Sequence, residues 1–100
     1  MYYLQGSFVA KEGKRDELAE ILLEAARLVG QVGGCHLYLV STKEGDPTSV
    51  FVTEVWDDQS AQEASLQNAE IRALIGQAMP IIDSVSDNRL ELETIGGLGL

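Results

Sequence analysis

His36 is the residue of this sequence best suited to moving a proton. It is the only histidine among 100 residues, and histidine is the side chain whose unperturbed pKa lies near neutrality. The only cysteine, Cys35, precedes it. Adjacent strand residues point to opposite faces of a sheet, so we expect Cys35 to be a buried spectator rather than a thiol activated by His36. His36 is therefore the candidate catalytic residue; the alternative is a hydrogen-bonded or half-exposed strand residue without chemistry.

A second group of candidates lies in the run Glu54-Val55-Trp56-Asp57-Asp58, which contains the only tryptophan. Trp56 could stack on a planar substrate and donate its indole N–H, or it could be a core side chain where a strand meets a helix. Glu54 could orient a donor or accept a proton, or it could pair with Arg72 or Arg89. Tyr38 and Phe8 could line a binding cavity, although aromatic residues are also ordinary in strands.

Charge and composition exclude several classes of partner. Hydrophobic residues make up 45% of the chain and charged residues 23%, a balance typical of a globular protein. The formal net charge of −9 repels phosphate backbones and anionic lipids, so we expect neither nucleic acid nor a membrane as a partner. With one histidine and one cysteine, a metal site would consist mostly of carboxylates, and we expect none. A single cysteine and no secretory signal pattern favour a cytoplasmic location.

The elements that position these residues follow from hydrophobic periodicity. Four runs rich in β-branched and aromatic residues predict strands, over residues 2–10, 35–42, 49–56 and 85–95. Apolar residues at three- and four-residue steps predict an amphipathic helix over 14–32. A second helical region follows the polar residues 57–60; it is broken near Asn68 and ended by Pro80. The tail 96–100 is expected to be loose.

This order, β-α-β-β-α-β, predicts a single α+β domain over residues 1–100 with a ferredoxin-like antiparallel sheet and both helices on one face. Phe51, Val52 and Val55 are apolar on both faces of their strand, whereas a strand with one wet face should alternate. We therefore expect a second sheet to cover the free face, which gives a homodimer through sheet-to-sheet packing.

Several of these segments resemble the antibiotic biosynthesis monooxygenase domain. The resemblance rests on Glu54-Val55-Trp56 followed by a polar cap and an alanine-rich helix, on Lys11-Glu12-Gly13-Lys14 after the first strand, and on Gly34-Cys35-His36 before the second. Members are dimeric α/β barrels. They include quinol monooxygenases, polyketide oxygenases that use neither metal nor flavin, haem-degrading enzymes, and an enzyme that processes a signalling sugar phosphate.

The departures from the family pattern concern its functional residues. Quinol-type members often carry two histidines on the second helix, and these positions correspond here to Ser65 and Glu70. Haem-degrading relatives use an asparagine, a tryptophan and a ligating histidine, which fall at about Gly6, Ser65 and Ile75. A haem role is disfavoured because an isoleucine side chain cannot ligate iron.

The resemblance implies a cofactor-independent monooxygenase that oxidises a small electron-rich, quinol-like aromatic in a pocket between sheet and helices. His36 would handle the proton and Trp56 would stack on the ring, with Tyr38, Phe8 and Ser65 completing the pocket. Two alternatives stay open. The first is a non-catalytic dimeric small-molecule binding module, which would explain Ser65 and Glu70. The second is an isomerase of a small signalling metabolite, although the acidic balance weighs slightly against a phosphorylated substrate.

Overall fold

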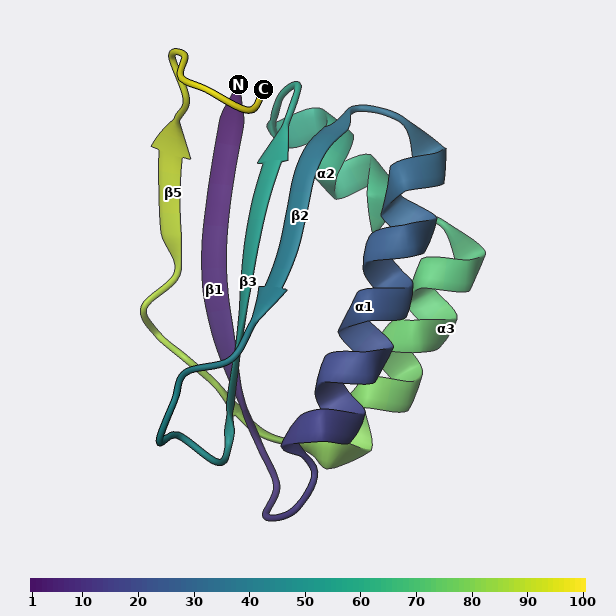
Figure 1. The fold of residues 1–100 in the computed structure, drawn as a ribbon. Helices are drawn as coiled ribbons and strands as arrows, with labels where there is room; N and C mark the ends of the chain where they lie inside the picture. Colours follow the sequence, from purple (N-terminus) through teal and green to yellow (C-terminus); the bar gives the residue numbers. More distant parts are fainter.

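The fold is a layer of helices on one face of a five-stranded antiparallel sheet. The computed structural model describes residues 1–100. Figure 1 shows all three helices on the same side of the sheet, with the other face uncovered. The elements follow in the order β1 (Tyr2–Ala10), α1 (Arg15–Val32), β2 (Cys35–Ser41), β3 (Ser49–Trp56), α2 (Gln59–Ser65), α3 (Ala69–Ala78), a 3-10 turn (Met79–Ile81), β4 (Ile82–Val85) and β5 (Leu90–Glu93). The expected ferredoxin-like α+β architecture is confirmed.

The last predicted strand is wrong in its limits. Regular pairing begins at Ile82 and is interrupted after Val85, so that the edge of the sheet consists of β4 and β5. Both strands pair with β1: β4 pairs with its end around Phe8 and Ala10, and β5 with its start around Tyr2 and Gln5. Residues 86–89 connect the two strands without regular strand structure, although the Ser86 N–H still donates to the Ser7 carbonyl of β1 at 2.9 Å.

The second helical region consists of two helices, as the sequence indicates around Asn68. The Oδ1 atom of Asn68 accepts hydrogen bonds from the backbone N–H groups of Glu70 (2.9 Å) and Ile71 (3.1 Å), which caps α3. Pro80 lies in the 3-10 turn after α3, where its missing N–H ends the helix. No helix combines the length and apolar character that crossing a bilayer requires.

The hydrophobic core consists of two separate clusters of buried side chains. The first contains Ala10, Leu18, Val50 and Ala78. The second contains Leu28, Val29, Trp56 and Ile71. Helix α1 packs on β2, and α3 packs on α1. Because α3 contacts α1 more than it contacts the strands, space is left between α3 and the part of the sheet formed by β1 and its edge partners.

The uncovered face of the sheet is rich in apolar side chains. Leu39, Leu90 and Leu92 are each between 42% and 50% exposed there. On the neighbouring strands, Tyr3 and other half-buried residues point to the same face of the sheet. A sheet face of this composition is normally covered in a folded assembly.

Candidate active site

A cavity of about 280 Å³ lies between the helices and the sheet. Nineteen residues line it, and 15 of them are hydrophobic. The four polar members are Glu54, Gln62, Ser65 and Arg89, and Tyr38 adds a phenol hydroxyl. A mostly apolar cavity with a few polar groups is the usual composition of a small-molecule site.

Strand register places Glu54 and Tyr38 side by side on the sheet surface that lines the cavity. Glu54 is the cross-strand partner of Leu4 on β1 and of Tyr38 on β2, so these three side chains form a row across the sheet on the helix side. Gly6 lies two residues further along β1, and a Cβ atom added there would meet nothing within 4 Å. An adjoining depression extends over Gly6 to Ser86 at this edge of the sheet, and it shares Glu54 and Arg89 with the cavity.

Glu54 is the titratable group best placed for chemistry in the cavity. Burial raises the pKa of its carboxyl above the ordinary value, while a hydrogen bond from Trp56 and the positive charge of Arg89 act in the opposite direction. The Trp56 indole N–H donates to Glu54 Oε1 at 2.9 Å. A carboxylate with a raised pKa is a stronger base than an exposed one. Trp56 fixes one oxygen, and the carboxylate has a second oxygen that can receive a proton.

Two neutral hydroxyl groups that line the cavity, those of Tyr38 and Ser65, are suited to hydrogen bonding. Burial, followed by the neighbouring charge of Glu54, raises the pKa of Tyr38 far above that of free tyrosine, so its phenol keeps its proton. The Ser65 hydroxyl donates to the backbone carbonyl of Gln62 at 2.6 Å. Gln62 and Ser65 are the two buried polar residues of the chain, and both line the cavity.

Arg89 is the only cationic residue that lines the cavity. It lies at the end of the 86–89 interruption, where it pairs with Glu91 at 3.2 Å and donates to the Tyr2 hydroxyl at 3.5 Å. Tyr2 in turn donates to Glu91 at 2.6 Å. These contacts hold the guanidinium at the edge of the cavity, where it can attract an anionic oxygen.

The structure separates the two residues that the sequence singles out most strongly. The Trp56 side chain is fully buried in the second cluster and does not line the cavity; it reaches the site only through Glu54. His36 lies on the surface, 39% exposed, with Nε2 at 2.5 Å from Asp57 Oδ1. The pairing of β2 with β3 is irregular between Cys35 and Leu37, and such a bulge turns the residue within it away from the regular ladder.

Three of the predicted site residues do line the cavity: Tyr38, Phe8 and Ser65. Glu54, considered above as a proton acceptor or an ion-pair partner, and Arg89, considered only as its possible partner, also line the cavity. The sequence could have indicated Glu54 through strand alternation, because every second residue shares a face. Glu54 thereby lies on the same face as the buried residues Val50, Val52 and Trp56. Arg89 carries no comparable signal, since its place depends on the interruption of the edge strand.

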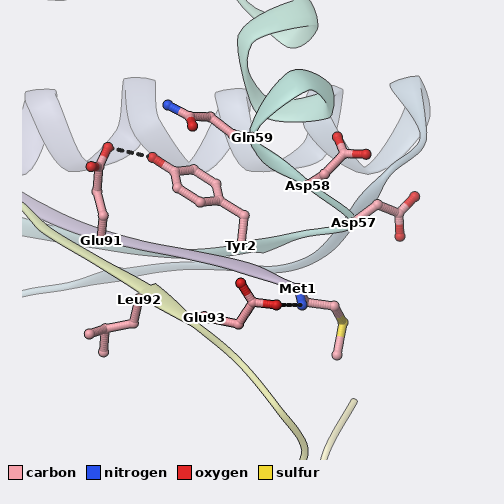
Figure 2. A pocket seen from close by; sticks show the side chains of 8 residues that line it. All are labelled: Met1, Tyr2, Asp57, Asp58, Gln59, Glu91, Leu92 and Glu93. Carbon is pink, nitrogen blue, oxygen red and sulfur yellow. Dashed lines mark hydrogen bonds and ion pairs between the residues drawn. The ribbon is translucent and has the colours of Figure 1, made fainter.

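A second depression lies beside Met1 and is acidic (Figure 2). Each of its carboxylates already has a local partner. Asp57 pairs with His36, Asp58 accepts from the Ala61 N–H at the start of α2, Glu91 accepts from Tyr2, and Glu93 lies 4.0 Å from the terminal amine. No three histidine, cysteine, aspartate or glutamate side chains come together as metal ligands anywhere in the chain. The cavity is therefore the candidate site.

Together, the sheet order and the cavity describe a ferredoxin-like α+β protein with a partly open, mostly apolar cavity between sheet and helices. The family model described as antibiotic biosynthesis monooxygenase matches residues 1–77. The chain belongs to this family.

Solved structures agree with that assignment. A protein from Chloroflexus aurantiacus J-10-fl, named as a candidate antibiotic biosynthesis monooxygenase, is 35% identical with a TM-score of 0.89; the match covers 98% of this chain and 96% of that one. A protein from Deinococcus radiodurans with the same family name is 23% identical, with a TM-score of 0.81 and coverage of 100% and 98%. A Pseudomonas aeruginosa protein is 17% identical, with a TM-score of 0.82 and coverage of 95% and 94%. The last two show the fold alone, and no curated protein matches this chain.

Proposed function

We propose that this protein is a cofactor-independent monooxygenase that oxidises a small, electron-rich, quinol-like aromatic in the cavity. The observation that carries the proposal is Glu54, a half-buried carboxylate with a raised pKa that is held by Trp56 in a mostly apolar cavity. Membership of the antibiotic biosynthesis monooxygenase family supports the class of reaction. The volume of about 280 Å³ lies at the small end of ligand pockets, which suits a substrate of one or two rings.

The proposed reaction begins with a proton transfer. Glu54 removes the proton of a ring hydroxyl as general base, and the positive charge of Arg89 stabilises the oxyanion that forms. The Tyr38 hydroxyl donates a hydrogen bond to an oxygen of the substrate. The apolar lining excludes bulk water, which strengthens these electrostatic interactions.

Dioxygen then reacts with a ring carbon of the electron-rich anion. A carbon–oxygen bond forms, and the oxygen–oxygen bond breaks as water leaves. One oxygen atom stays on the ring and the other departs in water, so a hydroquinone and dioxygen give a hydroxyquinone and water. The ring supplies all four electrons that reduce dioxygen, and the balance requires no further reductant.

Dioxygen uptake tests this proposal directly. Purified protein is incubated with hydroquinones and dihydroxynaphthalenes, with a chelator present and without added metal, flavin or nicotinamide, and uptake is compared with the autoxidation blank. The expected result is uptake above the blank and one isotopic oxygen atom in the product when labelled dioxygen is used. Uptake equal to the blank with every compound, or a product without the isotopic oxygen, would contradict the monooxygenase proposal.

The second candidate function is a non-catalytic small-molecule binding module. The observation that favours it is the position of His36, because no imidazole lines the cavity and the only histidine lies at the surface. Tight binding of phenols without any dioxygen uptake would support this function over the first.

We also propose that two copies pack through the uncovered faces of their sheets. Exposed leucines on β2 and β5 form an apolar surface there, and burying it would stabilise a dimer by roughly 25 cal/mol per Å² of apolar area removed from water. Light scattering coupled to size-exclusion chromatography measures the mass, and a monomer at micromolar concentration would contradict the dimer.

A further inference from the structure

The cavity joins the two clusters of the hydrophobic core. Phe8, Ile21, Leu22 and Ile82 line the cavity and pack against the first cluster, and Ala78 belongs to that cluster. Tyr38 and Leu74 line it and pack against the second cluster. The cavity therefore extends between the two clusters and is lined by different residues at each of them.

The polar groups gather at one end of this cavity. Glu54 is bonded to Trp56 of the second cluster, and Gln62 and Ser65 lie on α2, whose Ala61 packs against the same cluster. The end at the first cluster has only apolar side chains. Along β1, the two ends correspond to Leu4, opposite Glu54, and Phe8. Four residues of a strand span about 13 Å.

We infer that the preferred ligand is a phenolic ring that carries an apolar chain, with the ring at Glu54 and the chain directed toward Phe8 and Ala78. This inference rests on the proposed function for the role of the ring and adds the class of substituent. A cavity of about 150 Å³ holds one benzene ring. The cavity of about 280 Å³ therefore has room for a ring and a chain of about four carbons.

A chain that enters the apolar end gains the transfer free energy of each buried methylene group. That gain is about 0.8 kcal/mol per methylene, which lowers the dissociation constant about fourfold. A polar substituent of the same length would lose its hydration at this end without finding a partner. The affinity is therefore expected to rise with apolar chain length and to level off when the apolar end is full.

Isothermal titration calorimetry with resorcinol and its ethyl, butyl and hexyl derivatives tests this inference. These probes resist autoxidation, so binding is measured independently of turnover. The expected result is a dissociation constant that falls two- to fourfold per added methylene up to about four carbons. Equal affinity for resorcinol and the butyl derivative would overturn the inference.

Variants of the cavity test where the alkyl chain of the ligand lies. Ala78→Val narrows the apolar end and is expected to weaken binding of the butyl probe at least fivefold while leaving resorcinol unchanged. Ala73→Val is the matched control, because Ala73 lies on the same helix but is exposed and outside the cavity. Ile82→Phe is a second narrowing variant in case Ala78→Val folds poorly, and circular dichroism checks both. If both narrowing variants lost affinity equally for all probes, the alkyl chain of the ligand would not lie at the apolar end of the cavity.

The same measurements separate this inference from the proposed function. Affinity that rises with chain length but no dioxygen uptake with any alkylated hydroquinone would support the inference and refute the monooxygenase. Dioxygen uptake together with an affinity that does not change with alkyl chain length would support the monooxygenase and refute the inference.

Discussion

The indole N–H of Trp56 donates a hydrogen bond of 2.9 Å to a carboxylate oxygen of Glu54, two residues earlier on the same strand. Residues two apart on a strand share a face, so a fully buried tryptophan fixes a carboxylate that lines the cavity. The core thus orients the residue to which we assign the proton transfer.

Replacing Glu54 by glutamine is expected to lower the rate of dioxygen uptake by a factor of roughly 10² to 10⁴, the usual contribution of a general base. The wild-type rate should rise with pH as Glu54 ionises, with a midpoint above 4.5 because burial raises the pKa of the group. The variant should lose this pH dependence. The pH profile of kcat/KM measures both effects, and a variant with wild-type rates would remove Glu54 from the mechanism.

The same substitution should change how stability depends on pH. The pKa of Glu54 is raised in the folded state, so the folded protein binds this proton more tightly than the unfolded chain does. The resulting stabilisation is fully present below the unfolded pKa of about 4.5 and is lost as pH rises through the folded pKa. Urea unfolding as a function of pH should show this decline in the wild type and a smaller one in Glu54→Gln. Equal declines would mean that the carboxyl is solvated.

Trp56→Phe tests the hydrogen bond without removing the aromatic ring. The bond from Trp56 lowers the pKa of Glu54, so its loss should raise that pKa further and move the acid limb of the rate profile to higher pH. The profile of kcat/KM against pH measures the shift. If the acid limb of the profile stayed in place or moved to lower pH, the hydrogen bond from Trp56 would not lower the pKa of Glu54.

His36→Ala tests the role that the sequence suggests for the only histidine. His36 is exposed and pairs with Asp57 outside the cavity, so we expect dioxygen uptake to change less than about twofold and stability by no more than about 1 kcal/mol. Uptake assays and urea unfolding measure the two quantities. A loss of activity greater than tenfold in a folded variant would restore His36 as the proton handler.

Leu39→Glu tests the proposed dimer. The substitution places a charge on the uncovered face of the sheet, where a partner would have to bury it, and we expect the variant to be monomeric. Leu23→Glu on α1 is the matched control, because both leucines are 49% exposed but only Leu39 lies on the sheet. Light scattering measures the masses, and a dimeric Leu39→Glu variant would place the contact elsewhere.

Asn68→Ala should destabilise the protein by about 1 kcal/mol, because two backbone N–H groups at the start of α3 lose their acceptor. Asn88→Ala is the control, since Asn88 is exposed and caps no helix. Urea unfolding compares the two variants. Equal stabilities would show that solvent replaces the cap.

The sequence by itself determined the order of elements, since apolar periodicity depends only on local spacing. β1 and β3 begin and end where their β-branched and aromatic runs do, and Asn68 divides the second helical region as its capping preference indicates. Tyr38 and Phe8 of the cavity lining were candidates as aromatic residues of predicted strands, whereas Ser65 was a candidate only through the family resemblance.

Only the tertiary structure decided which polar groups share the cavity. Arg89 lines the same cavity as Glu54 because the edge strand is interrupted between β4 and β5, and His36 lies outside the cavity, beside an irregular pairing of β2 with β3. Both outcomes depend on strand register, which is set by packing between segments that are distant in sequence. A shift of one residue moves a side chain to the opposite face of a sheet, and spacing along a single strand contains no information about its partner's register.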